Sequence, residues 1–380
     1  ISILLPYLGF LRNFTTLLVF DSMVARENDD APRVMRNLRS TIAIGNHARA
    51  VPVLISDLVG LAIIARACDE VLETLETAPS LLSDSDLTEV AHRLSAFPND
   101  GGELVRIDAE ARYFEDVLQR VYTDDGRGNG HATAAGLRFL EEISSDPPSS
   151  SLERSINPIS AAIMADRATT RREYASLIAS TIAAARKPLW TWTRMPGHEI
   201  DDMSDSSLWR QRYPTIWLLM PALGRSAASA HRFTQSRDAT LTAVALELYH
   251  RRHGAYPESL EALVPSLVPA MPLDVFDGAP LKYALRDGRP LLYSIGTDRK
   301  DDGGRAPETG LFGPEGEWRS TQVVEGVLTD PARARSIDGD WILYPRPVPP
   351  EPSSPNGPPE AGPRAKIEPT NAPAAHPTED

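Results

Sequence analysis

The stretch from His231 to Gly304 constrains the fold most, because helix, turn and strand signals follow one another there in a fixed order. In the segment ATLTAVALELYHRRHGAYP, apolar residues recur at steps of three and four, which predicts one face of a helix. They are Leu241, Val244, Ala245, Leu248 and Tyr249. Basic residues at 251–253 occupy the expected last turn, and Gly254 follows as a stop signal. A helix is therefore predicted over residues 231–253.

Several prolines follow this helix in the sequence. Pro257 suits the first position of a new short helix, because it fixes φ and lacks an N–H group. The apolar side of that helix would consist of Leu260, Leu263 and Val264. Three further prolines interrupt regular structure and predict an extended connector over residues 265–273.

Two turn dipeptides, Asp277-Gly278 and Asp287-Gly288, lie beside segments rich in Leu and Tyr. They predict an antiparallel hairpin of residues 281–285 against residues 291–295. Gly296 is the expected end of the second strand.

The loop after this hairpin is acidic and rich in glycine. Asp298, Asp301 and Asp302 precede Gly303 and Gly304. Carboxylates this close repel one another unless they are solvated or neutralised, and glycines let backbone carbonyls turn toward a cation such as calcium, which takes about six to eight oxygen ligands. A calcium loop and a solvated acidic turn both remain open, because the EF-hand pattern with its closing Glu is missing.

Four segments follow one another in a characteristic order: ALELYHRRHGAYPESLEALVP, PLDVFDGAPLKY, LLYSIGTDRKDDGG and DGDWILY. Their order resembles the globular part of the major pseudopilin of bacterial type II secretion systems. The resemblance implies a long helix packed on a small antiparallel sheet and a calcium-binding loop near the end. Asp298 matches the Asp that follows the family's strand end, and Asp338 and Asp340 match its late acidic cluster. Backbone carbonyls around Ser294 and Ile295 would be further ligands.

The resemblance covers residues 229–344, under a third of the chain. Pseudopilins begin with a processed leader and a long apolar helix, whereas more than two hundred residues precede the module here. The nearest apolar run, 215–223, contains Pro221 and is too short to span a bilayer, which takes about 20 residues. A helical region followed by such a module is also similar to uncharacterised families of planctomycete-type bacteria.

Composition excludes several classes of function. Acidic residues outnumber basic ones by 52 to 39, a net charge of −13, which disfavours nucleic-acid binding. The single cysteine, Cys68, excludes a disulfide framework and a Cys-based zinc site, and it is expected to be inert packing. The phosphate loop, the nucleophile elbow and the dinucleotide fingerprint are all missing from the sequence.

Residues 1–145 carry one helix signal after another. The expected helix starts are Pro32, Pro52 and either Ser83 or Asp84, with a break expected at Gly45-Asn46. A fourth helix is predicted over residues 102–122. Short loops favour antiparallel neighbours, so an antiparallel helical bundle is predicted, with a repeat-like stack as the alternative.

The chain opens with Ile1 rather than Met, which suggests a fragment whose upstream signal or anchor is not in view. Residues 1–21 are apolar, but Pro6, Arg12 and Asn13 interrupt them. We therefore expect this segment to fail as a transmembrane span and to pack on its neighbours as an amphipathic helix.

Residues 146–228 are predicted to form a connecting region with a helix over 159–186 and an irregular aromatic, acidic segment after it. The tryptophans of that segment either line a groove or fill a domain boundary. They are Trp190, Trp192 and Trp209.

Two further sets of polar residues superficially resemble ion sites. One consists of His198, Glu199, Asp201 and Asp202, but it lacks a second His one helical turn away. The other is the loop TDDGRGNG at 123–130, which is interpreted as either a second cation loop or a solvated turn.

Together these patterns predict an α+β fold that is mostly α. A helical bundle is expected over 1–145, the connecting region over 146–228 and a pseudopilin-like module over 229–344. The tail, 345–380, has 12 prolines in 36 residues and is expected to be a disordered spacer or docking segment.

The favoured function is non-enzymatic: an extracytoplasmic structural or type II secretion-related envelope protein with a calcium-stabilised loop. Its expected ligands are Asp298, Asp301, Asp302, Asp338 and Asp340, with Ser294 and Ile295. Partners are expected among envelope or secretion proteins, with membrane contact only through an anchor upstream of residue 1. The alternatives are a helical protein-interaction scaffold without an ion site and, more distantly, a metal-dependent hydrolase using residues 190–209.

Overall fold

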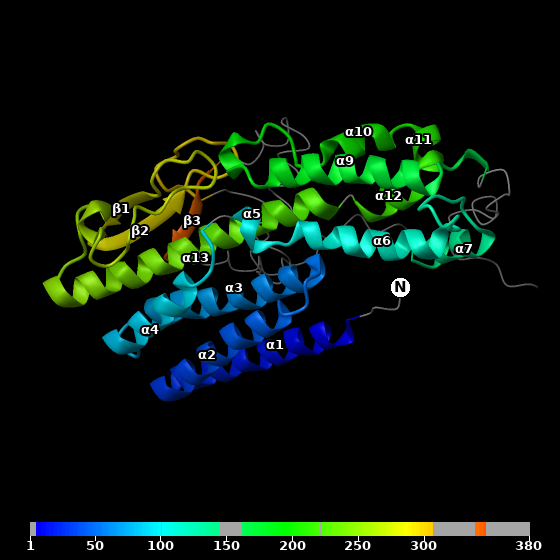
Figure 1. Ribbon diagram of the computed structural model, residues 1–380. Coiled ribbons are helices and arrows are strands. Elements are labelled where there is room, and N and C mark those ends of the chain that lie inside the picture. The colour runs from blue at the N-terminus through cyan, green and yellow to red at the C-terminus, as the bar shows by residue number, and fades with distance from the viewer. Residues whose placement is uncertain (1–4, 100, 144–161, 221, 307–338, 347–380) are drawn as a thin grey trace, which may run out of the picture. The chain divides into compact units, whose positions relative to one another are not determined.

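The computed structural model describes residues 5–99, 101–143, 162–220, 222–306 and 339–346 (Figure 1). Helices dominate these ranges, and a three-stranded antiparallel sheet follows them, so the predicted α+β, mostly α class is confirmed. The expected disordered tail lies outside the described residues.

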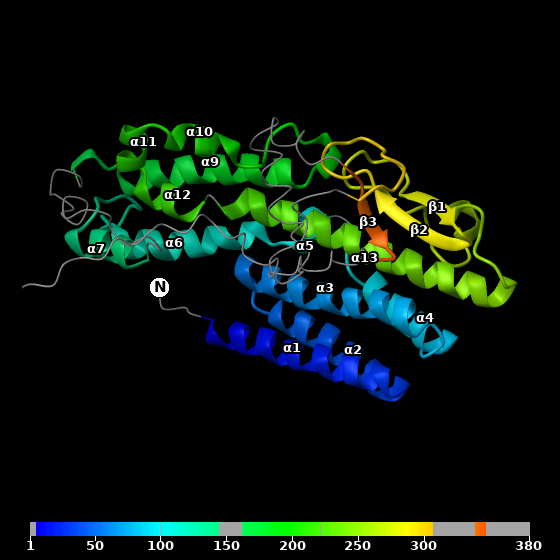
Figure 2. The same ribbon diagram turned by 180° about the vertical axis from the view of Figure 1, so that it is seen from behind.

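The first four helices are α1 (Pro6–Glu27), α2 (Ala31–Ala48), α3 (Leu54–Thr77) and α4 (Asp84–Ser95). Helices α1, α2 and α3 lie side by side in both views, with α1 outermost (Figures 1 and 2). The predicted Ser83 cap is confirmed, because its hydroxyl accepts the Asp86 N–H in a capping box.

One expectation about these helices is wrong. Helix α2 does not break at Gly45-Asn46; Gly45 instead allows α2 and α3 to approach closely, since a Cβ there would lie 2.9 Å from the Gly60 carbonyl oxygen. In α1, Pro6 occupies the first turn, where proline is tolerated. Residues Tyr7–Glu27 are consequently long and apolar enough to cross a membrane by length and composition, while α1 still packs on its neighbours as expected.

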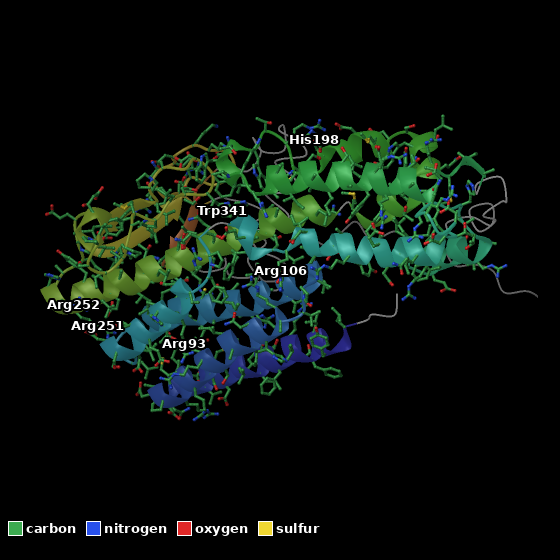
Figure 3. The ribbon with its side chains drawn as sticks, viewed as in Figure 1. Arg93, Arg106, His198, Arg251, Arg252 and Trp341 are labelled. Carbon is green, nitrogen blue, oxygen red and sulfur yellow. The ribbon has the colours of Figure 1, made fainter. Side chains whose placement is uncertain are left out.

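The fourth predicted helix is also interrupted. It consists of α5 (Gly101–Leu104), a 3-10 turn η1 (Ile107–Ala109) and α6 (Glu110–Val121). The interruption follows from Asp57, a fully buried carboxylate on α3 that accepts the Arg106 N–H at 2.9 Å and its Nε–H at 3.0 Å (Figure 3). Helix α7 (Ala134–Ile143) then packs on α6.

The connecting region is a series of shorter elements after α9 (Arg167–Ala185). The predicted helix over 159–186 is too long at its start, because Asp166 caps α9 by accepting the Thr169 N–H at 2.8 Å. The elements that follow are η2 (Leu189–Thr191), α10 (His198–Ser204), α11 (Ser207–Arg212) and α12 (Pro214–Leu219).

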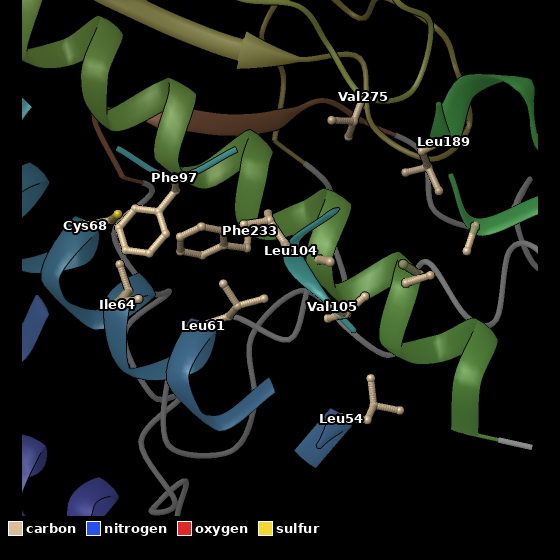
Figure 4. Close-up of a cluster of buried hydrophobic side chains, with 14 of the residues drawn as sticks. Leu54, Leu61, Ile64, Cys68, Phe97, Leu104, Val105, Leu189, Phe233 and Val275 are labelled. Atoms are coloured by element: carbon tan, nitrogen blue, oxygen red, sulfur yellow. The ribbon is translucent and has the colours of Figure 1, made fainter. Parts of the chain in front are cut away.

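Helix α13 (Ala222–His253) includes the predicted helix over 231–253 but begins earlier. It contacts α3, α4, α5 and α9 as well as the sheet, and the described residues up to Arg346 belong to one compact unit. Its Phe233 meets Phe97 edge to face, with ring centroids 5.8 Å apart, beside Ile64 and Cys68 of α3 (Figure 4). The first three helices and the sheet are therefore joined through α13.

The sheet confirms the predicted hairpin. Its strands are β1 (Lys282–Arg286), β2 (Arg289–Ser294) and β3 (Trp341–Tyr344), in the order β1-β2-β3. Asp287 and Gly288 both have positive φ, 51° and 75°, as a two-residue hairpin turn requires. Strand β3 pairs with β2 through Ser294 and Trp341.

The predicted helix starting at Pro257 is wrong in type. Only a 3-10 turn, η3 (Leu260–Leu263), forms there, with Ser259 before its first residue. Leu260 and Leu263 are nevertheless buried, as their apolar spacing predicted.

Candidate cation site at the C-terminal sheet

Asp274 anchors the connector to the end of strand β2. This fully buried carboxylate accepts the Ile295 N–H at 2.8 Å, the Ser294 hydroxyl at 2.9 Å and the Phe276 N–H at 2.9 Å. Burial raises the pKa of Asp274, although these three hydrogen bonds oppose the shift. The Ser294 hydroxyl and the Ile295 N–H are thus committed to Asp274.

Sequence reasoning missed Asp274. Its hydrogen bond to the N–H two residues later, Phe276, is the Asx turn that an Asp in the run PLDVFDG favours. That signal identifies the local turn, but the contact to Ile295, 21 residues away, depends on tertiary structure.

The acidic loop after β2 is built from two further turns of this kind. Asp298 Oδ1 accepts the Lys300 N–H at 3.1 Å, and Asp301 Oδ1 accepts the Gly303 N–H at 3.0 Å. Asp301 Oδ1 also accepts the Tyr293 hydroxyl at 3.1 Å. Burial and this carboxylate raise the pKa of Tyr293 to about 12. One oxygen of Asp301 is therefore fixed toward strand β2.

Strand β3 brings Asp340 against this loop, one residue before Trp341 (Figure 3). Asp340 is fully buried, and its Oδ2 accepts the Gly304 N–H at 2.7 Å. Within the described ranges its Oδ1 has no hydrogen-bond partner, and the same holds for Oδ2 of Asp302. The other oxygen of Asp302 lies 3.2 Å from Nη2 of Arg305.

Two carboxylates act on Asp340, and one of them, Asp302, is also paired with Arg305. Burial raises the pKa of Asp340 most, and the backbone N–H groups of Gly304 and Asp302 oppose the shift. The negative charges of Asp301 and Asp302 add smaller upward shifts. A carboxylate in this position favours either a proton or a cation beside it.

Of the expected ligands, Asp301 and Asp302 therefore lie within electrostatic reach of Asp340, and Asp298 belongs to the same loop. Asp338 lies outside the described residues. Nowhere in the described part of the chain do three or more His, Cys, Asp or Glu side chains form a group able to hold a metal ion. Backbone carbonyls, water and small side-chain movements would have to complete a coordination sphere.

The second candidate cation loop uses its oxygens internally. Asp124 accepts the Gly126 N–H and the Arg167 guanidinium, both at 2.8 Å. Asn129 Oδ1 accepts the Ala168 N–H at 3.1 Å, so the loop is fixed to the start of α9. The oxygens of this loop thus serve its own fold.

The polar side chains around His198 also make contacts within the protein. His198, labelled in Figure 3, has its Nδ1 3.0 Å from the Met195 carbonyl oxygen. Asp202 is paired with Arg194 at 2.6 Å. Burial raises the pKa of Asp201, whereas Arg194 lowers that of Asp202.

The tryptophans of this region fill contacts between segments. A Cβ at Gly278 would lie 2.7 Å from the ring of Trp190, which places the connecting region against the turn before β1. Trp192 donates its indole N–H to the Lys187 carbonyl at 2.9 Å and meets His231 of α13 edge to face. These contacts favour the interpretation of Trp190 and Trp192 as boundary packing.

Comparisons of the chain with protein-family models, with curated proteins and with solved structures give no match.

Proposed function

We propose that this chain is a non-enzymatic structural protein of a bacterial envelope whose C-terminal sheet is stabilised by a calcium ion. The ion would lie between the 298–304 loop and Asp340. The observation that carries the proposal is the buried Oδ1 of Asp340, which has no hydrogen-bond partner among the described residues although two further carboxylates act on it.

A calcium ion suits this donor set because it prefers carboxylate and carbonyl oxygens and tolerates irregular geometry. Oxygens of Asp302 and Asp340 would be the first ligands, with Asp298 and Asp301 as the further acidic ligands. When bound, the ion would offset the repulsion among these carboxylates. It would also hold β3 against the loop, since Asp340 precedes β3 directly.

We expect weak binding, in the range of about 10⁻⁴ to 10⁻³ M that is typical of extracellular calcium modules. Such an affinity suits an extracytoplasmic location, where free calcium is abundant. The resemblance of residues 229–344 to a type II secretion pseudopilin supports the same location and partners from the envelope or secretion machinery.

The test is thermal unfolding of the purified chain in calcium, in magnesium and in chelator. Calcium is expected to raise Tm by several degrees through mass action, and magnesium by less. Asp298→Asn should abolish the calcium shift. The matched control is Asp277→Asn, an exposed Asp outside the loop whose turn hydrogen bond to Ala279 an amide oxygen can keep.

Hydrogen exchange gives the second measurement. Calcium should slow exchange mainly in residues 272–344, and Asp298→Asn should remove that protection. Identical melts of the parent in calcium and chelator would refute the ion site and favour the helical scaffold.

A further inference from the structure

The outer face of α1 exposes several large apolar side chains. Its large side chains are exposed to 72% at Phe10, 52% at Phe14, 64% at Leu17 and 59% at Phe20, and Val24 is half exposed. Phe10, Leu17 and Val24 are seven residues apart, so they share one side of the helix, and Phe14 and Phe20 flank them. We call these five residues the α1 ridge.

The opposite face of α1 is fixed in the bundle. Thr15 and Ala25 are fully buried, and the Arg26 guanidinium pairs with Glu70 and Glu73 of α3. Asp21, at the edge of this face, accepts hydrogen bonds from the side chains of Arg33 and Asn37. Packing therefore leaves the α1 ridge on the side of the helix that faces away from the bundle.

We propose that the α1 ridge binds the surface of a lipid bilayer, with α1 lying in the plane of the interface. Residues Tyr7–Glu27 have the length and hydropathy of a membrane segment, yet most of this segment is not buried in the protein. A helix with a solvent-facing apolar side and a packed polar side is typical of in-plane membrane binding.

The ion pairs of α1 argue against a transmembrane orientation of the folded bundle. Spanning would carry Arg26, Glu70 and their neighbours into hydrocarbon, where charged side chains cost several kcal/mol each. Lying in the interface immerses only the α1 ridge and keeps these ion pairs in the protein.

Exposed arginines near α1 can contact the phosphates of lipid headgroups. Arg12 is exposed on α1, and Arg66 of α3 reaches α1 by donating to the Thr16 hydroxyl at 2.9 Å. On the other side, Arg36 of α2 is exposed and acts on Asp21. Helix α1 itself carries two arginines and two acidic residues, so attraction to anionic lipid would come from individual exposed arginines and not from a net positive charge.

The test measures flotation of the full chain with vesicles of phosphatidylcholine alone or of an equimolar mixture with phosphatidylglycerol. The parent should float with both and bind the anionic vesicles more strongly. Leu17→Ser should weaken binding about tenfold, because one large apolar side chain no longer enters the lipid. Leu208→Ser on α11 is the matched control, since Leu208 is 69% exposed but lies outside the ridge.

Arg12→Gln tests the electrostatic contribution to membrane binding. This variant should bind anionic vesicles more weakly and phosphatidylcholine vesicles as well as the parent does. Unchanged melting of each variant shows that folding is intact. The proposal is overturned if the parent stays unbound with both vesicle types, or if Leu17→Ser floats like Leu208→Ser. It is also overturned if sedimentation velocity finds a lipid-free dimer that Leu17→Ser dissociates, because a second copy would then cover the ridge.

Discussion

The guanidinium of Arg346 donates a 3.0 Å hydrogen bond to the carboxylate of Glu73, which ties the chain just after β3 to helix α3. The Arg346 N–H also donates to Glu76 at 2.6 Å. Because Glu73 additionally pairs with Arg26, the acidic side of α3 joins helix α1 to the end of the sheet. The position of β3 therefore depends on α3 as well as on β2.

Replacing Arg346 by Ala should lower the free energy of unfolding by about 1 kcal/mol. Both side chains of the Arg346–Glu73 pair are 33% exposed, so solvent screens the interaction. Urea unfolding measures the loss, and a double-mutant cycle with Glu73→Ala isolates the pair. Arg252→Ala, at an exposed position near the end of α13 (Figure 3), is the control and should change stability little. A coupling energy of zero would show that the Arg346–Glu73 pair does not hold the end of the sheet to α3.

Arg237→Met should be more damaging, by about 3 kcal/mol. The Arg237 side chain is fully buried, and it donates to the carbonyls of Phe97 and Pro98 at 2.9 and 2.6 Å and to Asn99 Oδ1 at 2.9 Å. Met fills much of the volume but leaves those acceptors without their donor. Chemical denaturation checks the loss, and a variant as stable as the parent would show that the arginine contributes no more than its volume.

Asp274→Asn should destabilise the sheet by about 2 kcal/mol. An amide keeps one acceptor oxygen but turns an NH₂ group toward a donor, so one of the hydrogen bonds from Ile295, Ser294 or Phe276 is lost. The matched control Asp277→Asn removes an exposed carboxylate of the same segment and should be nearly neutral. Hydrogen exchange should place the Asp274→Asn effect at 272–295, and protection equal to the parent there would refute the anchoring role.

Cys68 should resist thiol reagents in the folded protein. The side chain is fully buried, and burial raises the pKa of its thiol to about 12, so the reactive thiolate is scarce at neutral pH. Dithionitrobenzoate should react only at the rate of unfolding, and fully after denaturant is added. Rapid labelling of the native chain would show that α3 opens locally.

Local signals predicted the fold where they were strong. The Asp287-Gly288 turn fixes the hairpin, and Ser83 fixes the start of α4, because each acts within a few residues. The same rules fail where a distant group intervenes: Asp57 interrupts the predicted helix over 102–122 by binding Arg106. The close packing of Gly45 against α3 keeps a helix intact where the sequence suggested a break.

The residues of the candidate site also differ in whether local sequence signals could predict them. The acidic loop and Asp340 were predicted from sequence as calcium ligands, and in the structure Asp301 and Asp302 act electrostatically on Asp340. Calcium binding itself stays a prediction. Asp274 was missed because its role depends on strand β2 returning beside the connector. The exposed α1 ridge was also missed, since periodicity indicates an apolar face but only packing shows which faces are covered.

Asp340→Asn tests the charge at the centre of the proposed site. Because the pKa of Asp340 is raised in the folded state, its stabilising contribution is complete below its ordinary value and is lost as pH rises through the folded value. In chelator, the amide should therefore make the protein more stable than the parent at neutral pH, with a smaller decline from acid to neutral pH. Its oxygen can still accept the Gly304 N–H.

In calcium, the parent should instead be more stable than Asp340→Asn. At about 100 times Kd the ion stabilises the parent by about 2.7 kcal/mol, whereas Asp340→Asn has lost a ligand charge and should gain far less. Urea unfolding across pH, with calcium and with chelator, measures both effects on the same pair of proteins. If the variant is less stable than the parent in chelator at neutral pH, the Asp340 carboxylate is already stabilised within the protein. Its buried oxygen would then no longer support the proposed calcium site.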